Sequence, residues 1–95
     1  AITADASSQV ANVTSAVTEI NATSSTGAIS LADGAEGQIK TFINVSTSGT
    51  NNVVITPTNL RGGTTITLNA EGETVTCLFK NAKWNVIAGN GYVVA

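Results

Sequence analysis

Histidine and methionine are absent from this 95-residue chain, and cysteine, proline, tryptophan and tyrosine each occur once. Without histidine, the chain lacks the side chain that most often acts as general acid and base near neutral pH. The single cysteine excludes a disulfide within the chain. We therefore expect no imidazole catalysis and no disulfide framework.

Charge is also scarce, because charged residues make up 11% of the chain against roughly 25% in ordinary soluble domains. The four basic residues are dispersed, and the formal net charge is −2. Binding nucleic acid requires a dense row of positive side chains that neutralises phosphates. We expect no nucleic-acid partner.

Long apolar runs are missing too. No segment approaches the roughly 20 apolar residues that a helix needs to cross a bilayer, so we expect a soluble protein with no membrane partner. A chain of 95 residues forms one domain, near the size at which a single core is self-sufficient. We therefore expect association with other subunits to bury further surface.

From Gly37 to its last residue, the chain consists of short apolar segments separated by glycine-bearing turns. Alternation of apolar and polar residues predicts strands over residues 38–45, 53–56, 64–68, 74–80, 84–88 and 92–94. Glycine, asparagine and aspartate between them have the backbone freedom and side-chain bonding that tight turns need. The spacing is typical of an all-β fold, a small antiparallel β-sandwich or barrel-like domain with hairpins between sequence neighbours.

The strand expected over residues 38–45 has two distinct faces. One face carries Ile39, Thr41, Ile43 and Val45, and the other carries Gln38, Lys40 and Asn44 together with Phe42. Phe42 is thus an apolar exception on the polar side of the strand. An exposed Phe42 would mark a contact surface.

Residues 1–27 differ in composition from residues 28–95, and we interpret them as an N-terminal arm preceding the β domain. Two structures are open for this arm. Apolar residues at alternating steps of four and three match the seam of a short helix: Ala6, Val10, Val13, Val17 and Ile20. The many threonines and asparagines are poor helix formers, which favours a strand over residues 16–21 that returns through residues 24–27 to pair with residues 28–31.

The carboxylates offer no convincing catalytic or metal site. Glu71 and Glu73 flank a glycine in an expected turn, where solvation is easy. Asp33 and Glu36 lie in a turn that suits a hard cation, but two ligands are too few for a dedicated calcium loop. We predict a protein that is not an enzyme and has no catalytic residue, cofactor or metal.

Cys77 and Trp84 both lie in alternating apolar segments. A thiol in such a segment packs as a small hydrophobe, so we expect Cys77 to be buried. Trp84 shares a strand face with Val86 and Ala88, which favours the core, while an exposed indole would suit stacking on a sugar.

Four blocks of the chain, residues 31–41, 54–60, 63–68 and 84–86, resemble small β-rich virion structural proteins of marine tailed phages. The resemblance covers residues 28–95. It implies a particle component without an active site, usually a trimer, found as a head decoration protein or within fibre and tail proteins.

On this basis we expect a capsid decoration protein on the particle exterior, which stabilises the head shell through contacts with its own copies and with the major capsid protein or another virion protein. The alternative is a receptor-binding or glycan-binding module of a phage fibre or tail protein. The candidate interface residues are Val10, Val13, Val17, Ile20, Phe42 and Tyr92.

Overall fold

A computed structural model describes residues 2–4, 9–47 and 51–95 of the chain. Ala6, the first residue of the possible helical seam, and residues 48–50 of the expected loop lie outside the described residues. The described part contains no helix, so the helical alternative for the arm is wrong over residues 9–20.

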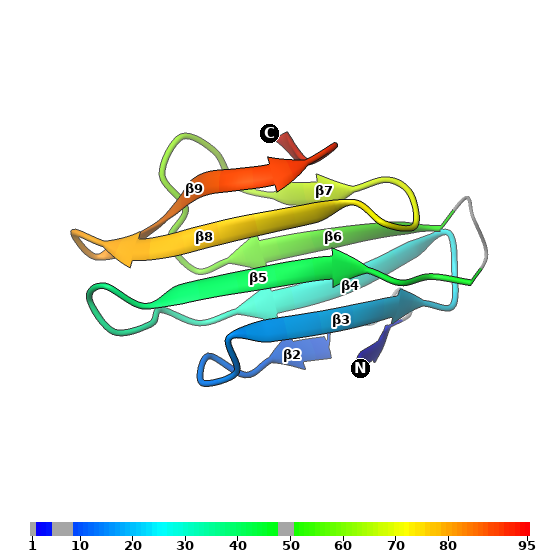
Figure 1. The fold of residues 1–95 in the computed structure, drawn as a ribbon, viewed down its shortest axis with the longest axis horizontal. Helices are drawn as coiled ribbons and strands as arrows, with labels where there is room; N and C mark the ends of the chain where they lie inside the picture. Colours follow the sequence, from blue (N-terminus) through cyan, green and yellow to red (C-terminus); the bar gives the residue numbers. More distant parts are fainter. Residues whose placement is uncertain (1, 5–8, 48–50) are drawn as a thin grey trace.

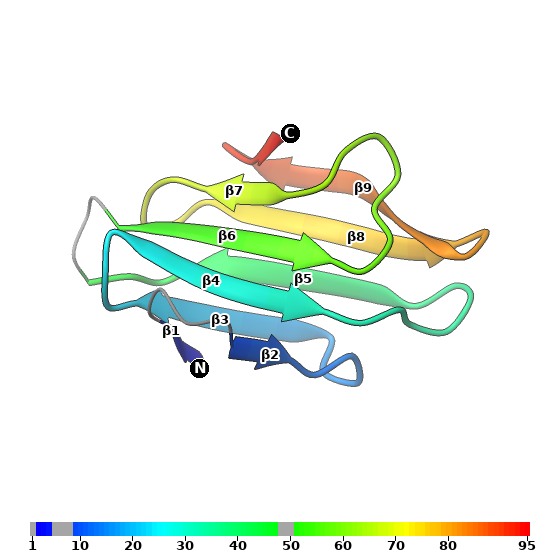
Figure 2. The same cartoon turned by 180° about the vertical axis from the view of Figure 1, so that it is seen from behind.

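The described residues form ten strands in two five-stranded sheets packed face to face, which confirms the small all-β sandwich (Figures 1 and 2). The sheet orders are β1-β3-β5-β8-β9 and β10-β7-β6-β4-β2. The strands are β1 (Ile2–Ala4), β2 (Gln9–Ala11), β3 (Val17–Ala22), β4 (Thr26–Leu31), β5 (Ile39–Asn44), β6 (Asn52–Pro57), β7 (Ile66–Leu68), β8 (Thr74–Lys80), β9 (Lys83–Asn90) and β10 (Val93–Val94).

The first six strands wind between the two sheets. Each passage through both sheets, which we call a coil, places one strand in each: β1–β2, β3–β4 and β5–β6. Consecutive coils stack with parallel pairing, β1 on β3 on β5 in one sheet and β2 on β4 on β6 in the other. Both sheets are therefore mixed, whereas the sequence analysis expected antiparallel pairing throughout.

The strands predicted over residues 16–21 and 28–31 exist as β3 and β4, but the hairpin between them is wrong. The connection over residues 23–25 carries the chain to the opposite sheet. A Cβ built on Gly27 would lie 2.8 Å from the Cβ of Ala22, so these two residues meet across the interior where the sheets approach closely. The expected boundary between residues 27 and 28 falls inside β4, which pairs with β6 from Thr26 to Leu31.

The remaining strands pair antiparallel, as expected: β5 with β8, β8 with β9, β6 with β7 and β7 with β10. The β8–β9 hairpin turns through Asn81 and Ala82, both with positive φ. The Glu36 carboxylate accepts the backbone N–H groups of these two residues at 2.8 and 3.0 Å. A side chain from a distant turn thus holds the tightest turn of the sandwich.

Between the sheets lies one apolar core, and it contains Trp84 and Cys77 as predicted. The Trp84 indole N–H donates to the carbonyl of Ala32 at 2.9 Å, and its ring meets Phe79 edge-on with ring centroids 5.2 Å apart. The largest fully buried apolar side chains besides Trp84 are Phe42, Ile20, Ile29, Leu31, Ile55, Ile66, Leu68, Val53 and Val75.

The two faces of β5 are confirmed, but their orientation is the reverse of the one that the polar residues suggested. Lys40, Phe42 and Asn44 point into the core and are fully buried. The opposite face points outward, and Ile39 on it is 53% exposed. The idea of an exposed Phe42 is wrong, because this ring is the largest apolar group on the strand and fills the interior.

Both polar side chains on the inward face have hydrogen-bond partners. Lys40 Nζ donates to the carbonyl of Ser15 at 2.8 Å and to Thr18 Oγ1 at 2.6 Å, and lies 5.2 Å from the centroid of the Phe42 ring. Asn44 donates to the carbonyl of Leu68 at 3.0 Å. Among the described residues, no buried side-chain nitrogen or oxygen lacks a partner.

We predict that Lys40 makes the stability of the protein depend on pH in the alkaline range. Burial lowers the pKa of Lys40 from its ordinary value of 10.5, so the unfolded chain binds this proton more tightly than the folded chain. Below the lowered pKa, Lys40 is charged in both states and the folded state carries the full cost of burying this charge. The free energy of unfolding should therefore rise as pH increases from the lowered pKa towards 10.5.

Urea unfolding of the wild type and of Lys40→Met between pH 7 and 10.5 measures this effect. The stability of the wild type relative to Lys40→Met should increase with pH, while Lys80→Met, which removes an exposed amine, should follow the wild type. Parallel curves for wild type and Lys40→Met would show that Lys40 is not desolvated.

Candidate interaction surface

The structure separates the six interface candidates. Val10 and Val17 are exposed and Tyr92 is 36% exposed, whereas Val13 is partly buried against the core and Ile20 and Phe42 are fully buried. Ile20 and Phe42 hold the two sheets together and have no surface to offer a partner. The seam from Val10 to Ile20 does not form, because these residues are divided between β2, the following connection and β3.

A different group of apolar side chains gathers on the outer side of the sheet β1-β3-β5-β8-β9. We call this surface the apolar face, and it consists of the outward residues Val17, Ile39, Thr41, Ile43, Thr76, Leu78 and Ile87. Figure 1 shows β3, β5, β8 and β9 of this sheet towards the viewer. Val17, Ile39 and Ile87 are each more than half exposed.

Strand register brings these side chains into contact rows. Ile39 lies opposite Leu78 across the β5–β8 pair. Thr41 lies between Val17 on β3 and Thr76 on β8, and the two threonine hydroxyls are 3.0 Å apart. Since directly opposite side chains in a sheet interact, the face is a continuous surface of β-branched and aliphatic groups.

Ile87 joins this face from β9. The register of β8 and β9 shifts between Thr76 and Cys77, as in a β-bulge. Val86 packs against the core, and the next residue, Ile87, turns outward with 52% of its side chain exposed. The face therefore extends over four adjacent strands.

The outer side of the other sheet, visible in Figure 2, is built from smaller groups. Its outward residues on β4, β6 and β7 are Thr26, Ala28, Ser30, Asn52, Val54, Thr56 and Thr67. Larger apolar side chains occur there on the flanking strands, at Val10 and Val93. The two outer surfaces differ in character, which singles out the apolar face as the candidate site.

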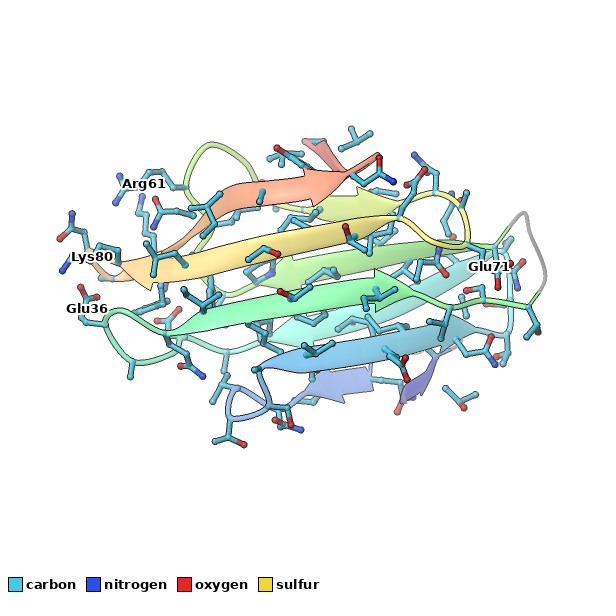
Figure 3. All side chains as sticks on the ribbon, viewed as in Figure 1. Glu36, Arg61, Glu71 and Lys80 are labelled. Atoms are coloured by element: carbon cyan, nitrogen blue, oxygen red, sulfur yellow. The ribbon has the colours of Figure 1, made fainter. Side chains whose placement is uncertain are left out.

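Charges lie mainly in the turns, on the two sides of the sandwich where the strands begin and end. Figure 3 places Glu36, Arg61 and Lys80 on one of these sides and Glu71 on the other. The charged outward residues of the sheet that carries the apolar face are Glu19 on β3 and, beside the β8–β9 turn, Lys80 and Lys83. A surface whose centre is nearly uncharged loses little solvation energy when it is covered.

The carboxylates considered as cation ligands are used to hold turns. Asp33 accepts from the Asn59 amide at 3.0 and 2.9 Å, so it faces a neighbouring loop instead of Glu36. Donation from the backbone N–H groups of Ala82 and Asn81 lowers the pKa of Glu36. Within residues 2–4, 9–47 and 51–95, no three His, Cys, Asp or Glu side chains are grouped as metal ligands.

The aromatic residues offer little for stacking on a sugar. Trp84, Phe42 and Phe79 are buried, and Tyr92 is the partly exposed member of the four aromatic residues. A stacking platform needs an exposed ring face. The interpretation of Trp84 as a sugar platform is therefore wrong.

The chain matches no protein-family model, and no curated protein is significantly similar to it. The part of the chain that the structure describes has no helix suited to crossing a membrane. Function is therefore inferred from the surfaces and topology of the molecule itself.

Sequence reasoning missed Ile39, Ile43, Leu78 and Ile87 as surface residues. The available signal was Phe42, because the bulkiest apolar residue of an alternating strand usually faces the core. Placing Phe42 inward turns Ile39 and Ile43 outward at once. Ile87 had a signal as well, because alternation from the core residues Trp84 and Val86 puts the next residue on the outward face.

We predict that Cys77 is unreactive in the folded protein. Burial raises the pKa of its thiol to about 11, so almost no thiolate forms at pH 8. An aromatic disulfide reagent should label the folded wild type at least about 100-fold more slowly than the chain unfolded in guanidinium chloride.

The matched control is Lys80→Cys in a Cys77→Val background, which moves the thiol to the exposed end of the same strand. This variant should be labelled rapidly while folded. Equally fast labelling of folded wild type would contradict the burial of this face of β8.

Proposed function

We propose that this protein is a structural component of a phage virion, a decoration protein of the head shell that acts by packing between subunits and has no enzymatic activity. The resemblance of residues 28–95 to virion structural proteins supports a location in the phage particle. The apolar face supports the mode of action, because it is the surface best suited to contact with other subunits.

The observation that carries this proposal is the orientation of β5. Lys40 and Asn44 are turned inward, where they require compensating hydrogen bonds, and Ile39 and Ile43 are turned outward. Fully burying an isoleucine contributes about 1.5–3 kcal/mol, which the isolated chain gains only in part from Ile39, because this residue is 53% exposed. Covering the apolar face by another subunit recovers this contribution.

Copies of the same chain fit this face well. The centre of the face carries no charge that repels an identical surface, and the charges beside it have opposite signs, Glu19 on β3 and Lys80 on β8. Most homo-oligomers have closed symmetry, and a trimeric ring forms when one part of this face contacts a different part of the same face on the next copy. In a homotrimer, each copy turns its apolar face towards the shared axis, and the outer side of the other sheet remains available to the capsid protein.

A module of a fibre or tail protein is the second candidate. The stacked parallel coils of residues 2–57 favour it, because coils of this kind extend naturally along one direction. Glycan binding by such a module has less support, since Trp84 and Phe42 are buried. Copy number per particle separates the two locations: hundreds of copies indicate the shell, and a few dozen indicate the tail.

We expect the double substitution Ile39→Lys with Ile87→Lys to dissociate the oligomer. Two ammonium groups would have to be buried in an apolar contact, so the dissociation constant should rise by at least about 30-fold. Sedimentation equilibrium reports the mass in multiples of the 9.5 kDa chain, and circular dichroism verifies the fold.

Thr56→Lys is the control, because it adds a charge to an exposed position on the outer side of the other sheet. It should leave the mass unchanged. A wild-type protein that stays monomeric up to about 0.1 mM would refute self-association through the apolar face. Failure of the wild type to bind purified heads that lack it would refute the shell location.

A further inference from the structure

The two ends of the sandwich differ in how their edge strands are protected. β1 and β2 are the edges of the two sheets at one end, and β9 and β10 are the edges at the other. Figure 2 shows β1 and β2 side by side below β3 and β4, with β7 and β9 at the far end. Unprotected edges present backbone groups to which other strands can pair.

The end formed by β9 and β10 is closed by the chain itself. The loop before β7 bonds to β9, since Arg61 N–H donates to the Trp84 carbonyl at 2.9 Å and Trp84 N–H donates to the Asn59 carbonyl at 3.0 Å. Ala95 continues the β10–β7 ladder by exchanging backbone hydrogen bonds with Thr65, and β10 has only two residues, so its free edge is very short. The register shift in β9 further disrupts a regular edge.

The end formed by β1 and β2 has no comparable protection among the described residues. Ile2–Ala4 and Gln9–Ala11 contain no charge and no proline, and both strands pair without a register shift. Natural proteins blunt exposed edges with charges, prolines or bulges and by keeping edge strands short, and of these devices β1 and β2 show only their length of three residues. This end therefore has the features of an edge that receives a partner.

The backbone groups available at this end can be assigned. The Ala4 carbonyl accepts the N–H of Thr23 at 2.7 Å, so the polar groups of Ala4 face β3 and those of Thr3, one residue earlier, face outward. In the other sheet, the Leu31 carbonyl accepts from Thr58 in the direction of β6, so Ser30 faces β2. Val10 lies opposite Ser30, and in parallel pairing its own polar groups then face outward.

The space between the sheets is narrow at this end. Ala4 and Ala11 are buried there. A Cβ on Gly27 would lie 2.8 Å from the Cβ of Ala22 and 3.2 Å from that of Ala4. Any strand pair that continues the two sheets must therefore turn small side chains inward.

We propose that the β1–β2 end docks one further coil from a partner polypeptide: two short uncharged strands that pair in parallel with β1 and β2 and carry small inward residues. Parallel addition repeats the step by which β1–β2 already stacks on β3–β4, and β3–β4 on β5–β6. This surface is separate from the apolar face, and the inference does not depend on the proposed virion function.

Each edge strand has only three residues, so a free coil binds weakly and a tethered one provides the test. We would place a second copy of residues 1–18 ahead of the chain. This copy supplies strands with small inward residues, and it puts the added Ile2 18 residues before the original Ile2, the same separation as between Ile2 and Ile20 in the natural chain. A tether supplies an effective concentration in the millimolar range.

The matched control carries Ala4→Pro and Ala11→Pro within the added copy only, because these positions would donate hydrogen bonds to the original edges. Both proteins carry Ile39→Lys and Ile87→Lys, so that association through the apolar face cannot influence the result. Amide exchange of the original Thr3 and Val10, measured by NMR, reports pairing at the two edges.

With the added coil, we expect exchange at Thr3 and Val10 to slow by at least about 10-fold relative to the proline control, and the thermal midpoint to rise. Equal exchange rates in the two proteins would overturn the proposal. Protection of the same amides in the unextended chain that increases with protein concentration would show instead that a second copy occupies this edge, which also overturns it.

Discussion

The polar side chains on the inward face of β5 need hydrogen-bond partners, and these partners connect the stacked coils to the antiparallel strands that follow them. Lys40 donates hydrogen bonds to Ser15, just before β3, and to Thr18 in β3. Asn44 bonds to the carbonyl of Leu68 in β7, and its oxygen accepts from Ser46, whose hydroxyl in turn accepts the N–H of Ala22. Sliding β5 by one residue would break these bonds and expose Phe42.

The same constraint determines the outer surface. Because Lys40, Phe42 and Asn44 occupy the inward positions, Ile39 and Ile43 must face outward, next to Val17 and Leu78. The apolar surface on one side of the sandwich is thus a direct result of the packing and hydrogen bonding that hold Lys40, Phe42 and Asn44 in the interior. This arrangement leaves apolar groups available for the contact between subunits that we propose.

The sequence predicted the positions of most strands but not their partners. Strand β8 was expected over residues 74–80 and is found there, because alternation and flanking glycines are local signals. Parallel stacking of β3 on β5 depends on which sheet each strand enters, and no local pattern encodes that choice. The orientation of β5 was missed because polarity was weighed above the size of Phe42. The interface candidates from Val10 to Ile20 followed a helical period in a segment that forms strands.

The stacked coils also affect the order in which the chain can fold. Strands β1 to β4 are made first during synthesis, yet each pairs with a strand 18 to 26 residues later, as in Ile2 with Ile20 and Thr26 with Asn52. The β8–β9 hairpin, by contrast, closes between immediate neighbours. Non-local parallel pairs form slowly because loop closure precedes their contacts. The antiparallel β5–β8 pair joins residues still further apart, 31 for Ile43 with Thr74 and 39 for Ile39 with Leu78. The sheet that carries the apolar face therefore becomes continuous only after this longest closure, with β5 as the strand on which β3 and β1 stack.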